Sequence, residues 1–279
     1  MRIPDPETST PPARESPFAL DHLTVIETTP LELAETAARA GYARVCTFVR
    51  SIEGLGGPSF DLSRAPGDRR AARAALDALE LTVDVAYPFT LSDRTQPGDF
   101  DADLDCAAEL GARFVNLLIF SRTAERIPDQ TARFCELARV RGLKVAVEMV
   151  PASAVKSLDQ AHRLLETLGR PTGFGVNLDI LHLYRSGSTP EAALVHREDV
   201  TYLQLCDGPL DMAAEARRHE ASLQRRLPGE GDFAISAFLA AFADVPASLE
   251  IPDEAGLRAG QSPVQRAARA NAAALQIMR

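Results

Sequence analysis

The stretch that decides the fold is LKVAVEMVPASAVKSLDQAHRLLETLGRPTGFGVNLDI, residues 143–180. It begins and ends with short apolar runs, and between them lies a segment with a helical pattern, SLDQAHRLLETLG (157–169). The two apolar runs are rich in β-branched residues and leucine and do not alternate with polar residues. Parallel strands that are buried on both faces require this composition. The stretch therefore predicts a strand, a helix and a second, parallel strand.

The same unit recurs along the chain from Leu23 onward. The helix expected in PLELAETAARAG (30–41) has Pro30 in its first turn and Gly41 at its end, which are favourable positions for these residues. The expected strands are 23–27, 43–50, 81–87, 112–120, 143–150, 173–180, 200–207 and 247–252. Eight strand–helix units predict an α/β fold, a single (β/α)8 TIM barrel over residues 19–279. An open doubly wound sheet uses the same alternation, but ETTPLELAE (27–35) lacks the GxGxxG fingerprint, which favours the closed barrel.

Composition excludes several classes of protein. The 279 residues are 46% apolar, as in a globular protein with a real core. A net charge of −9 argues against nucleic acid as a partner, and no apolar stretch is long enough for a membrane span. The four cysteines form no CxxC pair and follow no secretory leader, which indicates the reducing cytoplasm. Residues 1–18 are rich in Pro, Ser, Thr and charge, and we expect a disordered tail.

Four polar residues lie at or near the ends of the last four expected strands: Glu148, Asp179, Gln204 and Glu250. In a parallel barrel these strand ends meet at one mouth. Three carboxylates and an amide oxygen at one place predict a site for one divalent metal ion, Mn, Mg or Co. Singly, each residue also has an ordinary interpretation, such as an ion pair or a capped turn. Their occurrence on four successive strands favours the metal site.

Four further residues are candidates for binding a small-molecule substrate. His182 follows Asp179 by three residues, and Arg226 lies in the loop RRLPGEGDF (225–233), where an arginine could reach over the mouth. Arg50 and Asn116 lie in two earlier expected strands. The alternatives are a histidine bonded to the backbone, a solvated charge pair and interior packing.

Other segments are assigned less specific roles. We expect His22, His162, His196 and His219 to face solvent. The segment 208–230 contains an amphipathic, charged insertion, which is either a lid over the site or a surface excursion.

Five motifs together resemble the sugar phosphate isomerase/epimerase superfamily of xylose isomerase-like TIM barrels: VEMVP, NLDILHLYRSG, YLQLCDGP, RRLPGEGDF and SLEIP. The resemblance extends from about Leu20 over nearly the whole chain. It implies a metal held by Glu148, Asp179, the residue on strand seven and Glu250, and a homo-oligomer, often a dimer or a tetramer.

One position departs from the ketose epimerases of this superfamily. They usually have histidine on strand seven, where this chain has Gln204, which is similar to the 3-dehydroshikimate dehydratase branch. The related AP endonucleases use a zinc cluster with many histidines, and the five histidines of this chain do not fit that pattern.

The chemistry that the resemblance implies is proton transfer next to a carbonyl group. A divalent cation would stabilise the enolate or enediolate, while Glu148 and Glu250 act as base and acid. Reprotonation gives an epimer or an isomer, and loss of a β-hydroxyl gives dehydration. The hypotheses are therefore a metal-dependent isomerase or epimerase of a sugar-like keto compound, a dehydratase (a lyase), and a barrel that only binds a ligand.

Overall fold

Eight parallel strands form a closed barrel in residues 16–278, the part of the chain that this computed structural model describes. Each strand pairs with its sequence neighbours, and β1 pairs with β8 to close the ring. The strands are β1 (Ala19–Asp21), β2 (Arg44–Phe48), β3 (Thr82–Leu91), β4 (Phe114–Ile119), β5 (Lys144–Glu148), β6 (Phe174–Asp179), β7 (Val200–Leu205) and β8 (Ala247–Leu249). The structure thus confirms the predicted (β/α)8 barrel.

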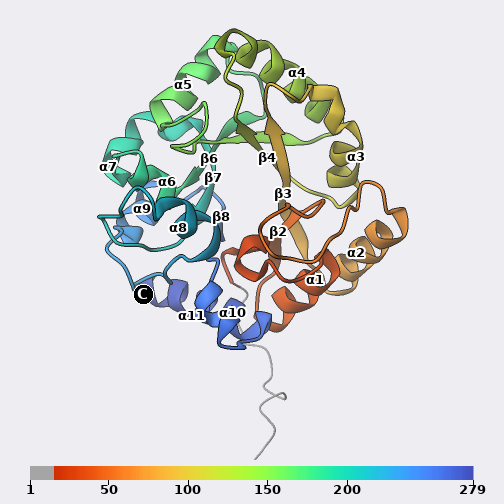
Figure 1. Cartoon of the computed structure of the whole chain (residues 1–279), viewed down its shortest axis with the longest axis vertical. Helices are drawn as coiled ribbons and strands as arrows, with labels where there is room; N and C mark the ends of the chain where they lie inside the picture. Colours follow the sequence, from red (N-terminus) through yellow and green to blue (C-terminus); the bar gives the residue numbers. More distant parts are fainter. Residues whose placement is uncertain (1–15, 279) are drawn as a thin grey trace, which may run out of the picture.

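Helices surround the ring of strands (Figure 1). They are α1 (Pro30–Arg39), α2 (Pro66–Ala78), α3 (Asp101–Glu109), α4 (Ile127–Arg139), α5 (Leu158–Thr167), α6 (Ile180–Arg185), α7 (Pro190–Ala193), α8 (Arg217–Leu223), α9 (Ile235–Ala241), α10 (Glu254–Arg258) and α11 (Pro263–Ile277). Short 3-10 helices are η2 (His22–Val25), η3 (Pro97–Phe100), η4 (Ala124–Arg126) and η5 (Leu194–Asp199). The local sequence explains where α1 begins, because Thr29 and Glu32 form a capping box and Pro30 follows the cap.

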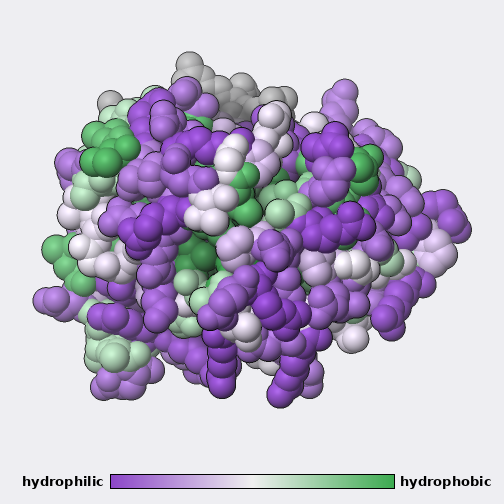
Figure 2. All heavy atoms as spheres, turned by 90° about the horizontal axis from the view of Figure 1, so that it is seen from above, coloured by the Kyte–Doolittle hydropathy of each residue, from purple (hydrophilic) through white to green (hydrophobic). Residues whose placement is uncertain are grey.

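The barrel interior is packed with side chains. Phe48, Tyr87, Phe114 and Tyr202 belong to one buried cluster inside the ring. The hydroxyl of Tyr202 bonds to Asp84, which also accepts a hydrogen bond from Arg44 at 2.9 Å. A filled interior is usual for this fold and leaves the carboxyl ends of the strands as the place for a site. Hydrophilic residues cover most of the side seen in Figure 2, and hydrophobic ones appear there in small groups.

The start of the barrel differs from the prediction. The run LTVIE, expected to be the first strand, largely forms η2, and the first strand is Ala19–Asp21. Asp21 ends this strand because its side chain accepts a hydrogen bond from the backbone N–H of Leu23 at 3.0 Å and caps the helical turn. Ser16 and Phe18 are buried, so the tail boundary predicted at residue 18 lies too far along the chain. Residues 1–15 of that expected tail lie outside the described residues.

Two further features concern the predictions that the chain lacks a membrane span and that its cysteines are unpaired. No helix between residues 16 and 278 combines the length and the apolar character that a membrane crossing needs. The four cysteines are free and buried.

His22 is buried, contrary to the expectation that it faces solvent. Its Nε2 lies 2.9 Å from the carbonyl oxygen of Thr28, and its Nδ1 accepts a hydrogen bond from the backbone N–H of Phe48. Burial lowers the pKa of His22 to about 4. The neutral imidazole therefore joins the turn after β1 to the end of β2.

This buried histidine should make the protein less stable in acid. Between pH 6.5 and about 4 the unfolded chain takes up a proton that folded His22 refuses, so the free energy of unfolding falls as the pH falls. The shift corresponds to about 3 kcal/mol. Urea unfolding across this range should show a smaller pH dependence for His22→Gln than for the wild type. The matched control is His219→Gln, whose imidazole is exposed; an unchanged slope in His22→Gln would contradict the prediction.

Candidate active site

The four residues predicted to bind metal lie at the carboxyl ends of adjacent strands. Glu148 and Asp179 are the last residues of β5 and β6, Gln204 is next to last in β7, and Glu250 directly follows β8. All four are buried. Three of them, Glu148, Gln204 and Glu250, line a cavity of about 210 Å³. Asp179 lies beneath it, in contact with the cavity-lining Arg225.

Glu148, Asp179 and His182 form one group of possible metal ligands. One ligand atom from each lies within 4.8 Å of the others. His182 Nε2 is 3.4 Å from Glu148 Oε1 and 3.8 Å from Asp179 Oδ2. Asp179 caps α6 through a 2.7 Å hydrogen bond from Leu181 N. Residues three apart lie on the same side of a helix, so the cap places His182 beside Asp179.

Arg225 is the guanidinium of the site, although Arg226 was the predicted one. Arg225 donates to Asp179 Oδ2 at 2.8 Å and to Glu250 Oε1 at 3.1 Å. Arg226 is exposed and donates to the backbone oxygen of Glu230. The chain is extended here, and neighbouring side chains in an extended chain point to opposite sides. The prediction chose the wrong member of the pair.

The loop RRLPGEGDF is folded around Asp207. Asp207 Oδ1 accepts hydrogen bonds from the N–H of Gly208 and Phe233, and Oδ2 accepts one from the N–H of Gly229. A Cβ atom on Gly231 would lie 2.3 Å from Asp207 Oδ1, so this turn requires glycine. The fixed turn holds the backbone from which Arg225 reaches the carboxylates.

The other predicted substrate-binding residues divide into two groups. His182 and Asn116 line the cavity, and Asn116 Nδ2 donates to Glu148 Oε2. Arg50 lies outside the cavity lining and pairs with Asp103 of α3 at 3.1 Å. The guanidinium of Arg50 therefore pairs with the outer layer of helices. It does not line the cavity in which a substrate contact was predicted.

A chain of three amides joins Glu148 to Glu250, and two of them, Asn116 and Gln204, line the cavity. Asn177 Nδ2 donates to Asn116 Oδ1 at 3.1 Å and to Gln204 Oε1 at 2.7 Å. The outer amides donate in turn to the carboxylates, Asn116 to Glu148 and Gln204 to Glu250. Sequence reasoning missed Asn177. The available signal was its position two residues before Asp179, because alternate residues of a strand face the same side.

Carboxyl groups outnumber guanidinium groups in this buried group. Asp21 lies near Glu250 and Arg225, and burial raises its pKa to about 6. Burial also raises the pKa of Glu250 well above its ordinary value, although Arg225 acts in the opposite direction. Asp21 Oδ2 is buried and has no hydrogen-bond partner among the described residues. Several carboxyl oxygens beside one guanidinium fit a divalent cation, whose charge would favour their ionised forms.

The segment 208–230, predicted as either a lid or a surface excursion, is held to the barrel by a buried ion pair among other contacts. Arg185 of α6 donates to both carboxylate oxygens of Glu220 in α8, and both side chains are buried. Arg185 also donates to the backbone oxygens of Pro209 and Leu210. This ion pair ties α8 to the strand-six side of the mouth.

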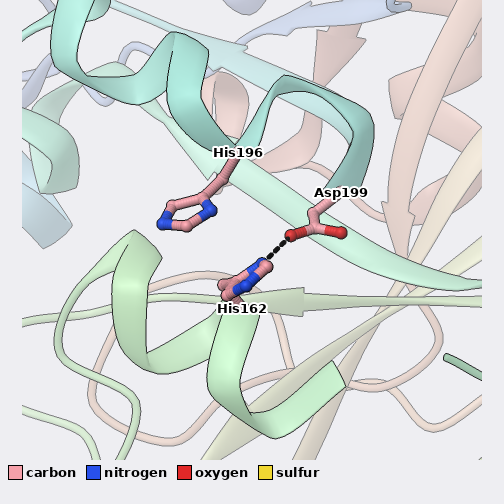
Figure 3. A group of neighbouring side chains, drawn as sticks. All are labelled: His162, His196 and Asp199. Carbon is pink, nitrogen blue, oxygen red and sulfur yellow. Dashed lines mark hydrogen bonds and ion pairs between the residues drawn. The ribbon is translucent and has the colours of Figure 1, made fainter. Parts of the chain in front are cut away.

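A second group of possible ligands lies away from the cavity (Figure 3). His162 of α5 points toward Asp199, 2.6 Å from Nδ1, and the ring of His196 stacks on that of His162. Arg170 donates to the other oxygen of Asp199. The buried carboxylate thus already has a cationic partner in Arg170, and the group links α5 to η5.

Comparison with known proteins identifies the family. The model of the xylose isomerase-like TIM barrel family matches residues 34–277. The chain belongs to this family. No curated protein matches it by sequence.

Solved structures share the fold of this family member. The IolI protein, described with a bound zinc atom, superposes with a TM-score of 0.74 at 17% identity, covering 93% of this chain and 97% of IolI. The probable 3-DHS dehydratase AsbF of Bacillus anthracis gives 0.70 at 13% identity, covering 90% and 97%. A D-allulose 3-epimerase of a Methylomonas species gives 0.68 at 14% identity, covering 96% and 100%. These neighbours are two kinds of enzyme, an epimerase and a dehydratase, and a zinc-binding protein on one fold.

Proposed function

We propose that this protein is a divalent-metal-dependent isomerase or epimerase that moves a proton next to the carbonyl of a small keto compound. The observation that carries the proposal is the convergence of buried Glu148, Asp179 and Glu250 at one mouth with a single guanidinium, Arg225. So many buried carboxylates are costly unless cations compensate them. The carboxylates that Arg225 alone does not compensate would bind a divalent cation.

Glu148, Asp179 and Glu250 would hold the metal, together with Gln204 or His182. Gln204 Oε1 now accepts from Asn177 while the NH2 faces Glu250, so binding through Oε1 needs a half-turn of the amide. The largely oxygen-donor set favours Mn, Mg or Co. When bound, the metal would polarise the carbonyl of the substrate and so acidify the neighbouring C–H.

Glu148 and Glu250 are the acid and base of the proposed reaction. They stand at the ends of strands separated by two others, and both reach the cavity. One carboxylate takes the proton from the carbon, and the other returns a proton to the opposite face or to the adjacent carbon. Asn116 and Gln204 each donate to one carboxylate and so orient it.

A dehydratase is the second candidate. The specific observation in its favour is Gln204. Glutamine at this position of strand seven is similar to the 3-dehydroshikimate dehydratase branch. The first step is the same proton removal, and loss of a β-hydroxyl then replaces reprotonation. The two candidates therefore differ in the product and share the base.

Two measurements test the proposal. Elemental analysis after chelation and refilling should find about one Mn²⁺ per chain, and absence of uptake would remove the basis for the enzyme. The refilled protein is then incubated with hydroxy ketones in deuterated water. Deuterium at the carbon next to the carbonyl of a recovered epimer or isomer supports the first candidate, whereas a growing enone or aromatic absorbance supports the dehydratase. Exchange with none of the compounds would contradict both.

Asn177 should control metal affinity without touching the metal. Replacing it by leucine keeps the volume but releases the amides of Asn116 and Gln204, each of which contacts a carboxylate of the site. We expect Asn177→Leu to weaken Mn²⁺ binding about 10–100-fold by calorimetry, as for other residues that orient metal ligands.

The matched control is Asn271→Leu on α11. Asn271 is buried, donates one hydrogen bond to Ala40 O, and has an Oδ1 without a partner among the described residues, as Asn177 does. Equal Mn²⁺ affinities for the two variants would show that Asn177 does not orient the ligands.

A further inference from the structure

The cavity has two chemically different walls. Its polar wall consists of the acidic and amide residues from β4 to β8 described above. Its other wall is hydrocarbon, and it comes from β2, β4 and the loops that follow strands: Phe48, Ile52, Leu55, Leu118, Phe120 and Val150. Phe120 is 41% exposed although it is large and apolar. An exposed aromatic ring beside a polar site is a surface that a ligand can cover.

The cavity also lacks a cation that could receive an anionic group. Arg225 is the only Lys or Arg among the described residues that line it. Its nitrogens donate to Asp179, to Glu250 and to the backbone oxygen of Ala221. His182 lies between Glu148 and Asp179.

Charge therefore selects against phosphate. Proteins bind phosphate with arginine, lysine or free backbone N–H groups, and the start of α6, which follows β6, is already capped by Asp179. Apart from the metal of the proposed function, a phosphate dianion placed here would face Glu148 and Glu250 without a free positive side chain in the lining. In a site shielded from water this repulsion is stronger than in solution.

We propose that the substrate is an uncharged hydroxy ketone with a hydrocarbon or aromatic face, and that it carries no phosphate. The inference rests on the proposed function and adds the substrate class to it. The oxygen-bearing edge meets Glu148 and Glu250, and the apolar face packs against Phe48, Leu118 and Phe120. This arrangement gives the exposed ring of Phe120 a partner and leaves Arg225 with its carboxylates.

Two pairs of small probes test the proposal on the full chain. Hydroxyacetone and 2-hydroxyacetophenone share the hydroxy ketone and differ in methyl against phenyl, and binding to the Mn²⁺-loaded protein is measured by calorimetry. We expect the phenyl compound to bind at least about tenfold tighter, from the apolar area that it buries. Dihydroxyacetone and its phosphate are compared on the metal-free protein, so that phosphate cannot bind through the metal. The phosphate should bind no better than the parent compound.

Variants decide whether the apolar wall causes the preference. Phe120→Ser and Leu118→Ser should reduce the preference for phenyl severalfold, since each removes part of the contact area. The control is Val140→Ser, because Val140 is 62% exposed and lies outside the cavity lining. Circular dichroism and unfolding curves verify that each variant is folded.

The possible results separate this inference from the proposed function. Equal affinity for the methyl and phenyl compounds, tighter binding of the phosphate, or binding of none of the probes would overturn the inference. Absence of hydrogen–deuterium exchange, with the phenyl preference of the Mn²⁺-loaded protein intact, would instead overturn the proposed function.

Discussion

Replacing Glu250 or Glu148 by glutamine should lower turnover of the keto substrate by about 10²–10⁴-fold, the usual contribution of a positioned acid or base. Glutamine keeps the shape of glutamate but cannot accept or deliver the proton. Proton NMR in deuterated water measures both the appearance of product and the exchange of the C–H next to the carbonyl. If the two residues serve opposite faces, each variant should still exchange the proton on the face of the remaining glutamate while conversion stops.

The effect on metal must be separated from the effect on proton transfer. Each variant is measured at saturating Mn²⁺, and its metal content is determined in parallel. Glu109→Gln is the matched control, because Glu109 lies on α3 and pairs with Arg69 away from the mouth. If both site variants retained full turnover, Glu148 and Glu250 would not be the acid and base.

Arg225→Met should destabilise the metal-free protein by about 3–5 kcal/mol, the usual cost of removing one partner of a buried ion pair. Arg225 has a nearly inaccessible side chain and donates to both Asp179 and Glu250. Methionine fills a similar volume but leaves these carboxylates without a cation. Urea unfolding of the chelated protein gives the change in the free energy of unfolding.

Metal should restore part of this loss. If Asp179 and Glu250 bind a dication, saturating Mn²⁺ supplies the missing charge and stabilises the folded state by mass action. The control is the adjacent Arg226→Met, which removes only an exposed side chain bonded to Glu230 O and should cost less than about 0.5 kcal/mol. Equal losses in the two variants would show that Arg225 does not compensate the buried carboxylates.

The positions of Glu148, Asp179 and Glu250 followed from sequence because each ends or directly follows an apolar run. Such a residue lies at the carboxyl end of its strand, independently of how the rest of the barrel packs. The assignment of Arg226 failed for the opposite reason. Which of two adjacent arginines faces the site depends on the orientation of the extended loop, and Asp207 sets that orientation from another segment.

Three other differences between prediction and structure also arise from contacts between segments that are distant in the sequence. Asn177 looks like an ordinary strand residue, and its importance comes from Asn116 on β4 and Gln204 on β7, distant in sequence. His22 looks solvent-facing until Phe48 and Phe60 are placed against its ring. Likewise LTVIE has the composition of a strand, but the pairing of Leu20 with Val45 and Leu249 fixes β1 earlier in the chain.

By itself the sequence determined the alternation of strands and helices, the barrel, and the strand ends at which acidic side chains gather. These features depend on local composition and on the order of segments along the chain, and both can be read from the sequence. Only the tertiary structure decided which arginine neutralises the carboxylates, which amide links them, and that a hydrocarbon wall faces them. Each of these depends on contacts between segments that are far apart in the chain, where direction and distance come from the packing of the whole barrel.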